Sequence, residues 1–147
     1  MRRITASLAA IALLAGAGQA AAKSTALAID QLKFEPVHDA AQRGVLAVDG
    51  AGRPLTFLLK IKRGDVLPPH GEGGGLRLLT VLSGNLSWGD GDRLDRAAER
   101  IFRPGSVIVV PAQGGQHWAA ARGGDVLLQV VFVRDGALSP EAAIQVK

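Results

Sequence analysis

The chain contains no cysteine and only three histidines among its 147 residues. The absence of cysteine excludes a disulfide scaffold, a zinc finger, a thiol nucleophile and an iron–sulfur site. Lysine and arginine are scattered and form no basic run after residue 22, so we expect no nucleic-acid binding. With 48% apolar and 20% charged residues the composition is that of a globular protein, which excludes disorder of the whole chain.

The first 22 residues have the pattern of a secretory signal peptide. Arg2 and Arg3 form a basic start, residues 4–18 are apolar without a charge, and residues 20–22 supply an Ala-x-Ala cleavage site. The apolar run is shorter than the roughly 20 residues that a membrane-spanning helix needs, and no later segment is long enough. Removing residues 1–22 lowers the net charge from +4 to +2, because the segment carries two arginines and no acid. We therefore expect a periplasmic or secreted protein with no membrane span after cleavage.

The remaining sequence has the pattern of short β-strands. Apolar runs are separated by Gly, Pro, Asn and Asp and cover residues 45–48, 55–61, 76–82, 86–88, 100–102, 107–110, 117–121 and 126–133. This spacing is typical of an all-β sandwich or barrel. The last run is apolar at both odd and even positions, which favours a strand covered on both faces. Single helical turns are expected at residues 95–99 and 139–142, the second capped by Ser139.

His70, Glu72 and His117 are the residues best suited to hold a metal ion. In an extended segment His70 and Glu72 project from the same face, and His117 lies on a later strand. Two imidazoles and one carboxylate with open positions suit iron, manganese, nickel or zinc. The alternative is that a histidine beside a glycine-rich loop is simply solvated.

The same residues resemble the two motifs of the cupin superfamily. A stretch similar to the first motif begins at Gly64. Five residues separate it from His70-Gly71-Glu72, four more precede Arg77, and six more precede Gly84. The second is similar to Gly105, five residues, Pro111 and then His117. The resemblance extends over residues 55–134. It implies a double-stranded β-barrel of the jelly-roll type, homodimers in many members, and metal-dependent chemistry on small molecules of dioxygenase, isomerase or lyase type.

The chain departs from the family pattern at the implied ligands. Glu72 stands where the family has its second histidine, and Arg77 stands where the family has its glutamate. Arg77 cannot bind a metal, because its guanidinium stays protonated. Two readings stay open: Arg77 holds the carboxylate of an anionic substrate beside a metal, or Arg77 pairs with Glu72 and replaces the metal.

Other residues are weaker candidates. Gln116 and Gln129 are predicted to line the pocket with Arg77, although Gln129 also suits a satisfied core amide. Trp118 should face away from His117 and pack, Trp88 is expected at a barrel end, and His38 is expected at the surface.

The sequence thus predicts a single domain with four segments. These are a cleaved signal (1–22), N-terminal strands (23–54), a cupin barrel (55–134) and a C-terminal tail (135–147). The expected function is binding of a divalent metal in an exported barrel that acts on a small molecule. The alternative is a metal-free barrel that binds a small ligand or serves a structural role.

Overall fold

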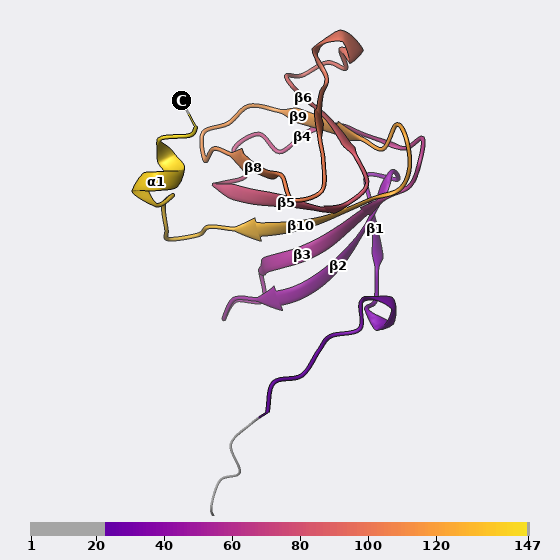
Figure 1. The fold of residues 1–147 in the computed structure, drawn as a ribbon. Coiled ribbons are helices and arrows are strands. Elements are labelled where there is room, and N and C mark those ends of the chain that lie inside the picture. Colours follow the sequence, from indigo (N-terminus) through magenta and orange to yellow (C-terminus); the bar gives the residue numbers. More distant parts are fainter. Residues whose placement is uncertain (1–22, 147) are drawn as a thin grey trace, which may run out of the picture.

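Two antiparallel sheets make up the protein in the computed structural model, which describes residues 23–146 (Figure 1). The larger sheet has the order β1-β2-β3-β10-β5-β8. Its strands are β1 (Glu35–Val37), β2 (Ala41–Val48), β3 (Pro54–Ile61), β10 (Val126–Phe132), β5 (Arg77–Ser83) and β8 (Val107–Val110). The smaller sheet, in the order β4-β9-β6-β7, contains β4 (Val66–His70), β9 (His117–Ala120), β6 (Leu86–Asp90) and β7 (Arg100–Phe102).

The core lies between the facing sides of these sheets. Leu128 and Val130 of β10 are buried in it together with Leu79 and Val81 of the neighbouring β5. Alternate residues of a strand point to opposite faces, so Gln129 lies on the outer face of the larger sheet. The predicted all-β jelly-roll barrel is confirmed, with the interior filled by apolar side chains.

Each of the eight apolar runs identified in the sequence corresponds to an observed strand, and the runs at residues 100–102 and 107–110 have the observed bounds. Two further strands, β1 and β4, are absent from that pattern. Pro36 lies within β1, and Pro68 and Pro69 lie within β4. Proline has no N–H for the ladder, and the β4–β9 register shifts between Leu67 and His70. Both strands are edges of their sheets, where proline is tolerated.

Short helices flank the barrel. The turn η2 (Arg96–Ala98) is capped by Asp95, and α1 (Pro140–Ala143) is capped by Ser139, whose Oγ accepts from the Ala142 N–H. Both agree with the predicted helical turns, while η1 (Ile29–Gln31) has no counterpart in the prediction. Figure 1 shows α1 beside the ends of β8 and β5, at the side of the barrel. The C-terminal segment therefore lies close to the interior that the two sheets enclose.

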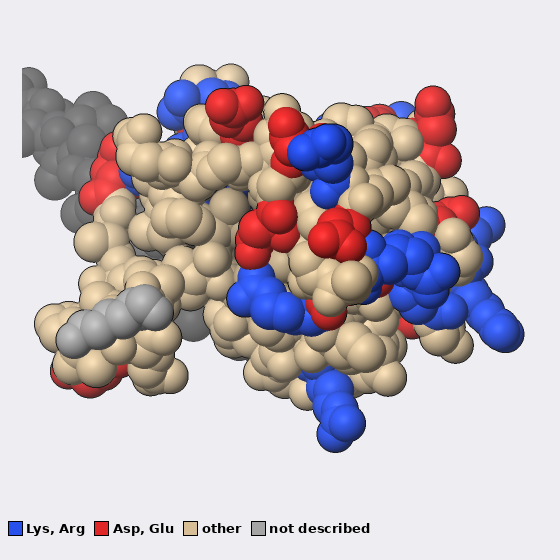
Figure 2. Space-filling view, turned by 90° about the horizontal axis from the view of Figure 1, so that it is seen from above, with Lys and Arg blue, Asp and Glu red and all other residues tan. Residues whose placement is uncertain are grey.

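Acidic and basic side chains are interspersed on the face seen from above in Figure 2. Several acidic and basic side chains of the described residues form ion pairs, including Arg100 with Asp90 and Arg122 with Glu99. None of the helices formed by residues 23–146 has the length and apolar character needed to cross a membrane. The predicted signal peptide lies outside the described residues.

Candidate functional site

All three histidines of the chain meet at one end of the barrel. The ring centroids of His70 and His117 are 4.6 Å apart, and His38 lies 5.2 Å from His70 on the other side. Trp88 stacks on His117 with a centroid distance of 4.3 Å and an angle of 16° between the planes. The four rings form a row that runs from the solvent into the core, since His38 is exposed and Trp88 is buried.

Strand pairing explains how His70 reaches His117. The last residue of β4 is directly opposite the first residue of β9, so both imidazoles project at the same level. The Nδ1 atom of His70 lies 2.7 Å from the Pro68 carbonyl oxygen. A carbonyl can only accept, so Nδ1 carries the proton and Nε2 keeps its lone pair. The ring is thereby fixed in one tautomer and one orientation.

His38 is the site residue that the sequence analysis placed only at the surface. It occupies the turn between β1 and β2, where His38 and Asp39 have φ angles of 51° and 54°. Such a turn is formed by two successive residues in the left-handed region, and it folds the hairpin tip onto β4. The side chain is exposed, as expected, but the hairpin also brings it to His70. The only sequence signal was the scarcity of histidine in this chain.

Arg77 faces the barrel interior. It shares its face of β5 with the core residues Leu79 and Val81. Its Nη2 donates to the Gly71 carbonyl at 2.8 Å, while the buried Nε has no hydrogen-bond partner. A Cβ on Gly71 would lie 2.5 Å from His117 Cε1 and 3.0 Å from Arg77 Nη2, so the guanidinium lies beside the imidazole of His117. Among residues 23–146 no carboxylate forms a salt bridge with Arg77.

Glu72 does not join this group. Strand β4 ends at His70 and Gly71 has a φ of 87°, so the alternation that would place Glu72 beside His70 is broken. The Glu72 side chain is exposed, and its Oε2 lies 3.5 Å from Gln116 Nε2. The hypothesis that Arg77 pairs with Glu72 is not supported by this arrangement, because no salt bridge joins them. Gln129, on the outer face of the larger sheet, is likewise separated from His117.

The electrostatics of the site disfavour positive charge. Burial, His70 and Arg77 together lower the pKa of His117 to about 4. Burial also lowers the pKa of His70, with further contributions from His38 and Arg77. Burial lowers the pKa of Arg77 as well. At neutral pH the site therefore holds two neutral imidazoles and one guanidinium that has no counter-ion among residues 23–146.

A metal centre of the kind implied by the resemblance does not fit these residues. In the part of the chain that the structure describes, no three His, Asp or Glu side chains converge closely enough to hold a metal ion. The carboxylate of Glu72 points to solvent, and the Arg77 guanidinium lies beside the imidazoles. A divalent cation there would face repulsion from a half-buried positive charge.

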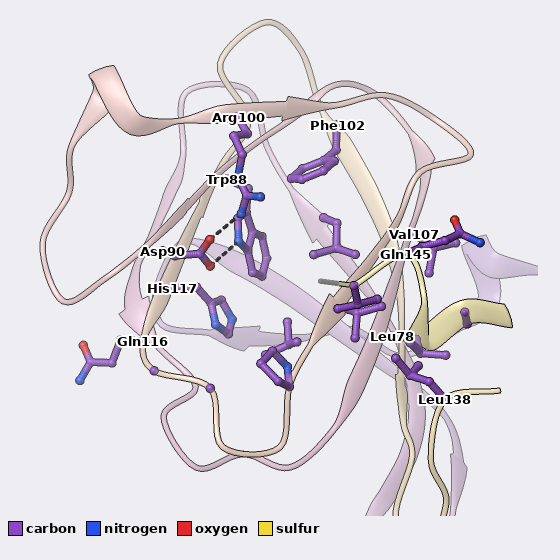
Figure 3. A pocket seen from close by; sticks show the side chains of 18 of the residues that line it. Leu78, Trp88, Asp90, Arg100, Phe102, Val107, Gln116, His117, Leu138 and Gln145 are labelled. Carbon is purple, nitrogen blue, oxygen red and sulfur yellow. Dashed lines mark hydrogen bonds and ion pairs between the residues drawn. The ribbon is translucent and has the colours of Figure 1, made fainter. Parts of the chain in front are cut away.

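A cavity of about 820 Å³ opens next to His117 (Figure 3). It lies between β8 and the β6–β7 hairpin, the loop of residues 111–116 borders one end, and the C-terminal segment covers one side. Figure 3 shows Trp88, Asp90 and His117 along one wall, and Gln116 directed away from the other side chains. Trp88, expected at a barrel end, is 2% exposed and forms part of this wall. The volume is within the range of small-molecule sites.

The depressed pKa of His117 predicts a specific pH dependence of stability. The unfolded chain takes up the proton near pH 6.5 and the folded protein only near pH 4, so the unfolded state binds more protons in between. We expect the free energy of unfolding to fall by about 2 kcal/mol between pH 7 and pH 4.5 on account of this residue. Urea denaturation of the wild type and His117→Asn at both pH values measures it. An equal loss in both proteins would contradict the assignment.

No protein-family model matches this sequence, and no curated protein matches it. Solved structures do match. A predicted oxalate decarboxylase from Thermotoga maritima superposes with a TM-score of 0.59 at 15% identity, over 73% of this chain and 96% of that one. A sugar phosphate isomerase from a cupin superfamily, from Silicibacter pomeroyi, gives 0.54 at 18% identity, over 73% and 74% of the two chains.

The chain has the cupin fold. The cupin domain of Drosophila melanogaster CENP-C is a third match, with a TM-score of 0.53 at 15% identity over 69% of this chain and 75% of that domain. The similar structures thus include proteins named as enzymes and a domain of a protein not named as one. Identities this low establish the fold and leave the activity to the residues of the site.

Proposed function

We propose that this protein binds a small carboxylate-bearing molecule at the barrel end, without a metal ion. The observation that carries the proposal is Arg77, a half-buried guanidinium with no carboxylate partner among the described residues and an unpartnered Nε. A buried charge is costly unless a counter-charge and hydrogen bonds compensate it. A ligand carboxylate supplies both, and the planar guanidinium binds it through two parallel hydrogen bonds.

The neighbouring groups support an anionic ligand. His70 and His117 are neutral at pH 7, so the Arg77 guanidinium is the positive charge of this group, and the N–H of the neutral His117 imidazole can donate a hydrogen bond to the carboxylate. The cavity beside His117 offers room for the rest of the molecule. Glu72, the nearest acid in the motif, is directed to solvent and does not compete for Arg77.

Arg77→Met tests this proposal. We expect cyclohexanecarboxylate or glucuronate, in the presence of a chelator, to raise the Tm of the wild type, because a ligand that binds only the folded state stabilises it. Arg77→Met should lower the affinity for the acid at least 30-fold. Arg77→Lys should retain part of the affinity, since lysine keeps the positive charge but cannot donate two parallel hydrogen bonds to a carboxylate. Absence of any shift with both acids would overturn the proposal.

The second candidate is the metal-dependent enzyme, with His70, Glu72 and His117 as ligands, Arg77 as substrate anchor, and Gln116 and Gln129 in the pocket. The retained pair of histidines favours it. It requires Glu72 to turn inward from its exposed position and bind a cation beside Arg77. Near-stoichiometric iron, manganese, nickel or zinc in the purified protein, lost in Glu72→Ala, would establish this candidate in place of the first.

Export to the periplasm or the medium is part of the same proposal and depends on the sequence pattern of residues 1–22. Association of two copies is an expectation implied by the resemblance. Binding of a carboxylate at Arg77 depends on the barrel and requires neither export nor a dimer.

A further inference from the structure

Most of the side chains that line the cavity beside His117 are apolar. β6, β7, β8 and the C-terminal segment all contribute such side chains, among them Trp88, Phe102, Ile108, Val110, Leu138 and Val146. Figure 3 shows Trp88 and Phe102 on one side of the cavity and Leu138 on the other. A ligand that fills this space therefore exchanges contact with water for contact with hydrocarbon.

The polar side chains of the cavity already have partners. Asp90 accepts from Trp88 Nε1 at 3.0 Å and from Arg100 Nη2 at 2.5 Å, so its carboxylate is neutralised and hydrogen-bonded. Gln145 donates to the Glu141 carbonyl at 3.3 Å. Gln116 is directed toward Glu72, away from the cavity. Of the polar side chains along the described walls, His117 is the one that makes no hydrogen bond.

This distribution discriminates between classes of acid. A hydroxyl-rich ligand would lose its hydrogen bonds with water and find few replacements among the side chains of the cavity, and each unpaired hydroxyl weakens binding. An apolar body has no hydrogen bonds with water to lose, and its burial makes the free energy of binding more favourable. His117, which borders both the cavity and the Arg77 guanidinium, fixes the polar end of the ligand.

We infer that the ligand is a carboxylic acid with an apolar ring or chain as its body, and that the site binds sugar acids of the same size more weakly. The carboxylate lies at Arg77 and His117, and the body lies in the cavity between β8 and β7. This inference rests on the proposed function, because it assigns the rest of the molecule whose carboxylate Arg77 binds.

Two probes of matched shape test the inference. Cyclohexanecarboxylate and glucuronate both carry a carboxylate on a six-membered ring, but only glucuronate carries hydroxyls. Isothermal titration of the purified protein should show at least tenfold tighter binding of cyclohexanecarboxylate than of glucuronate. Equal affinities, or tighter binding of glucuronate, would overturn the inference and leave the proposed function intact. If neither acid binds, the result contradicts the proposed function itself.

Variants of β7 and β8 locate the body of the ligand. Phe102→Ala should weaken cyclohexanecarboxylate five- to tenfold and change glucuronate less than twofold. Ile101→Ala is the matched control, since Ile101 precedes Phe102 and is 68% exposed on the opposite face. Ile108→Val removes one methyl group from the core-facing side of β8 and replaces Phe102→Ala if that variant does not fold. Undiminished affinity in both Phe102→Ala and Ile108→Val would show that the body of the ligand does not lie in this cavity.

Discussion

Arg77→Glu should bind about one equivalent of zinc or nickel, under loading conditions in which the wild type retains less than a tenth of that amount. The substitution removes the positive charge beside the two imidazoles and places a carboxylate on the interior face of β5. His70, His117 and the new carboxylate then supply two nitrogen donors and one oxygen donor, a set that divalent transition metals accept. Elemental analysis by mass spectrometry after gel filtration measures the change.

Arg77→Gln is the control for this experiment. It removes the same charge without adding a metal ligand, so its metal content should stay at the wild-type level. The thermal stability of Arg77→Glu should also become metal-dependent, because a metal that binds only the folded state raises Tm. Equal metal in the Glu and Gln variants would contradict the geometry assigned to residue 77. Full occupancy in the wild type would instead favour Glu72 as the ligand.

Gly89→Ala should destabilise the fold by about 3 kcal/mol or more. Gly89 of β6 lies opposite Trp118 of β9, and a Cβ at this position would lie 1.9 Å from Cζ2 of the indole. The indole cannot move aside easily, since it is 1% exposed and its Nε1 donates to Glu99 Oε1 at 3.3 Å. Glu99 is itself held by Arg122. Urea denaturation at neutral pH measures the loss.

Gly123→Ala is the matched control, because nothing lies within 4 Å of a Cβ built at that glycine. Its free energy of unfolding should remain within about 0.5 kcal/mol of the wild type. A loss of less than 1 kcal/mol in Gly89→Ala would show that β6 and β9 can separate to admit a methyl group. The tight contact between Gly89 and Trp118 would then have no structural role.

The pattern of apolar residues revealed most strands of the barrel, because the buried positions of a strand are apolar. The run at residues 126–133 shows this best, since Val126, Leu128 and Val130 alternate into the core. β1 and β4 are short and contain proline, so local pattern gave no indication of them. β4 forms because it pairs with the distant β9, and β1 forms because it pairs with β2 in a hairpin.

The candidate site was predictable only in part. The motif spacing indicated His70, Arg77 and His117, and these three do lie together. The convergence of Glu72 with them was an inference from strand alternation, which fails at Gly71 because its left-handed φ ends the strand. Gln129 lies apart from these residues, on the outer face of the larger sheet. The alternation along β10 is regular, but the sequence does not say which face of the strand is the interior.

By itself the sequence determined the β-strand pattern, the cupin resemblance and the presence of an arginine where the related motif has a metal ligand. These are local properties, because they depend on the order and chemistry of residues close together in the chain. Only the tertiary structure decided that His38 joins His70, that Trp88 stacks on His117 and that Arg77 lacks a carboxylate partner among the described residues. Each depends on which segments far apart in the chain lie side by side, and that is set by sheet pairing and packing rather than by the residues nearby.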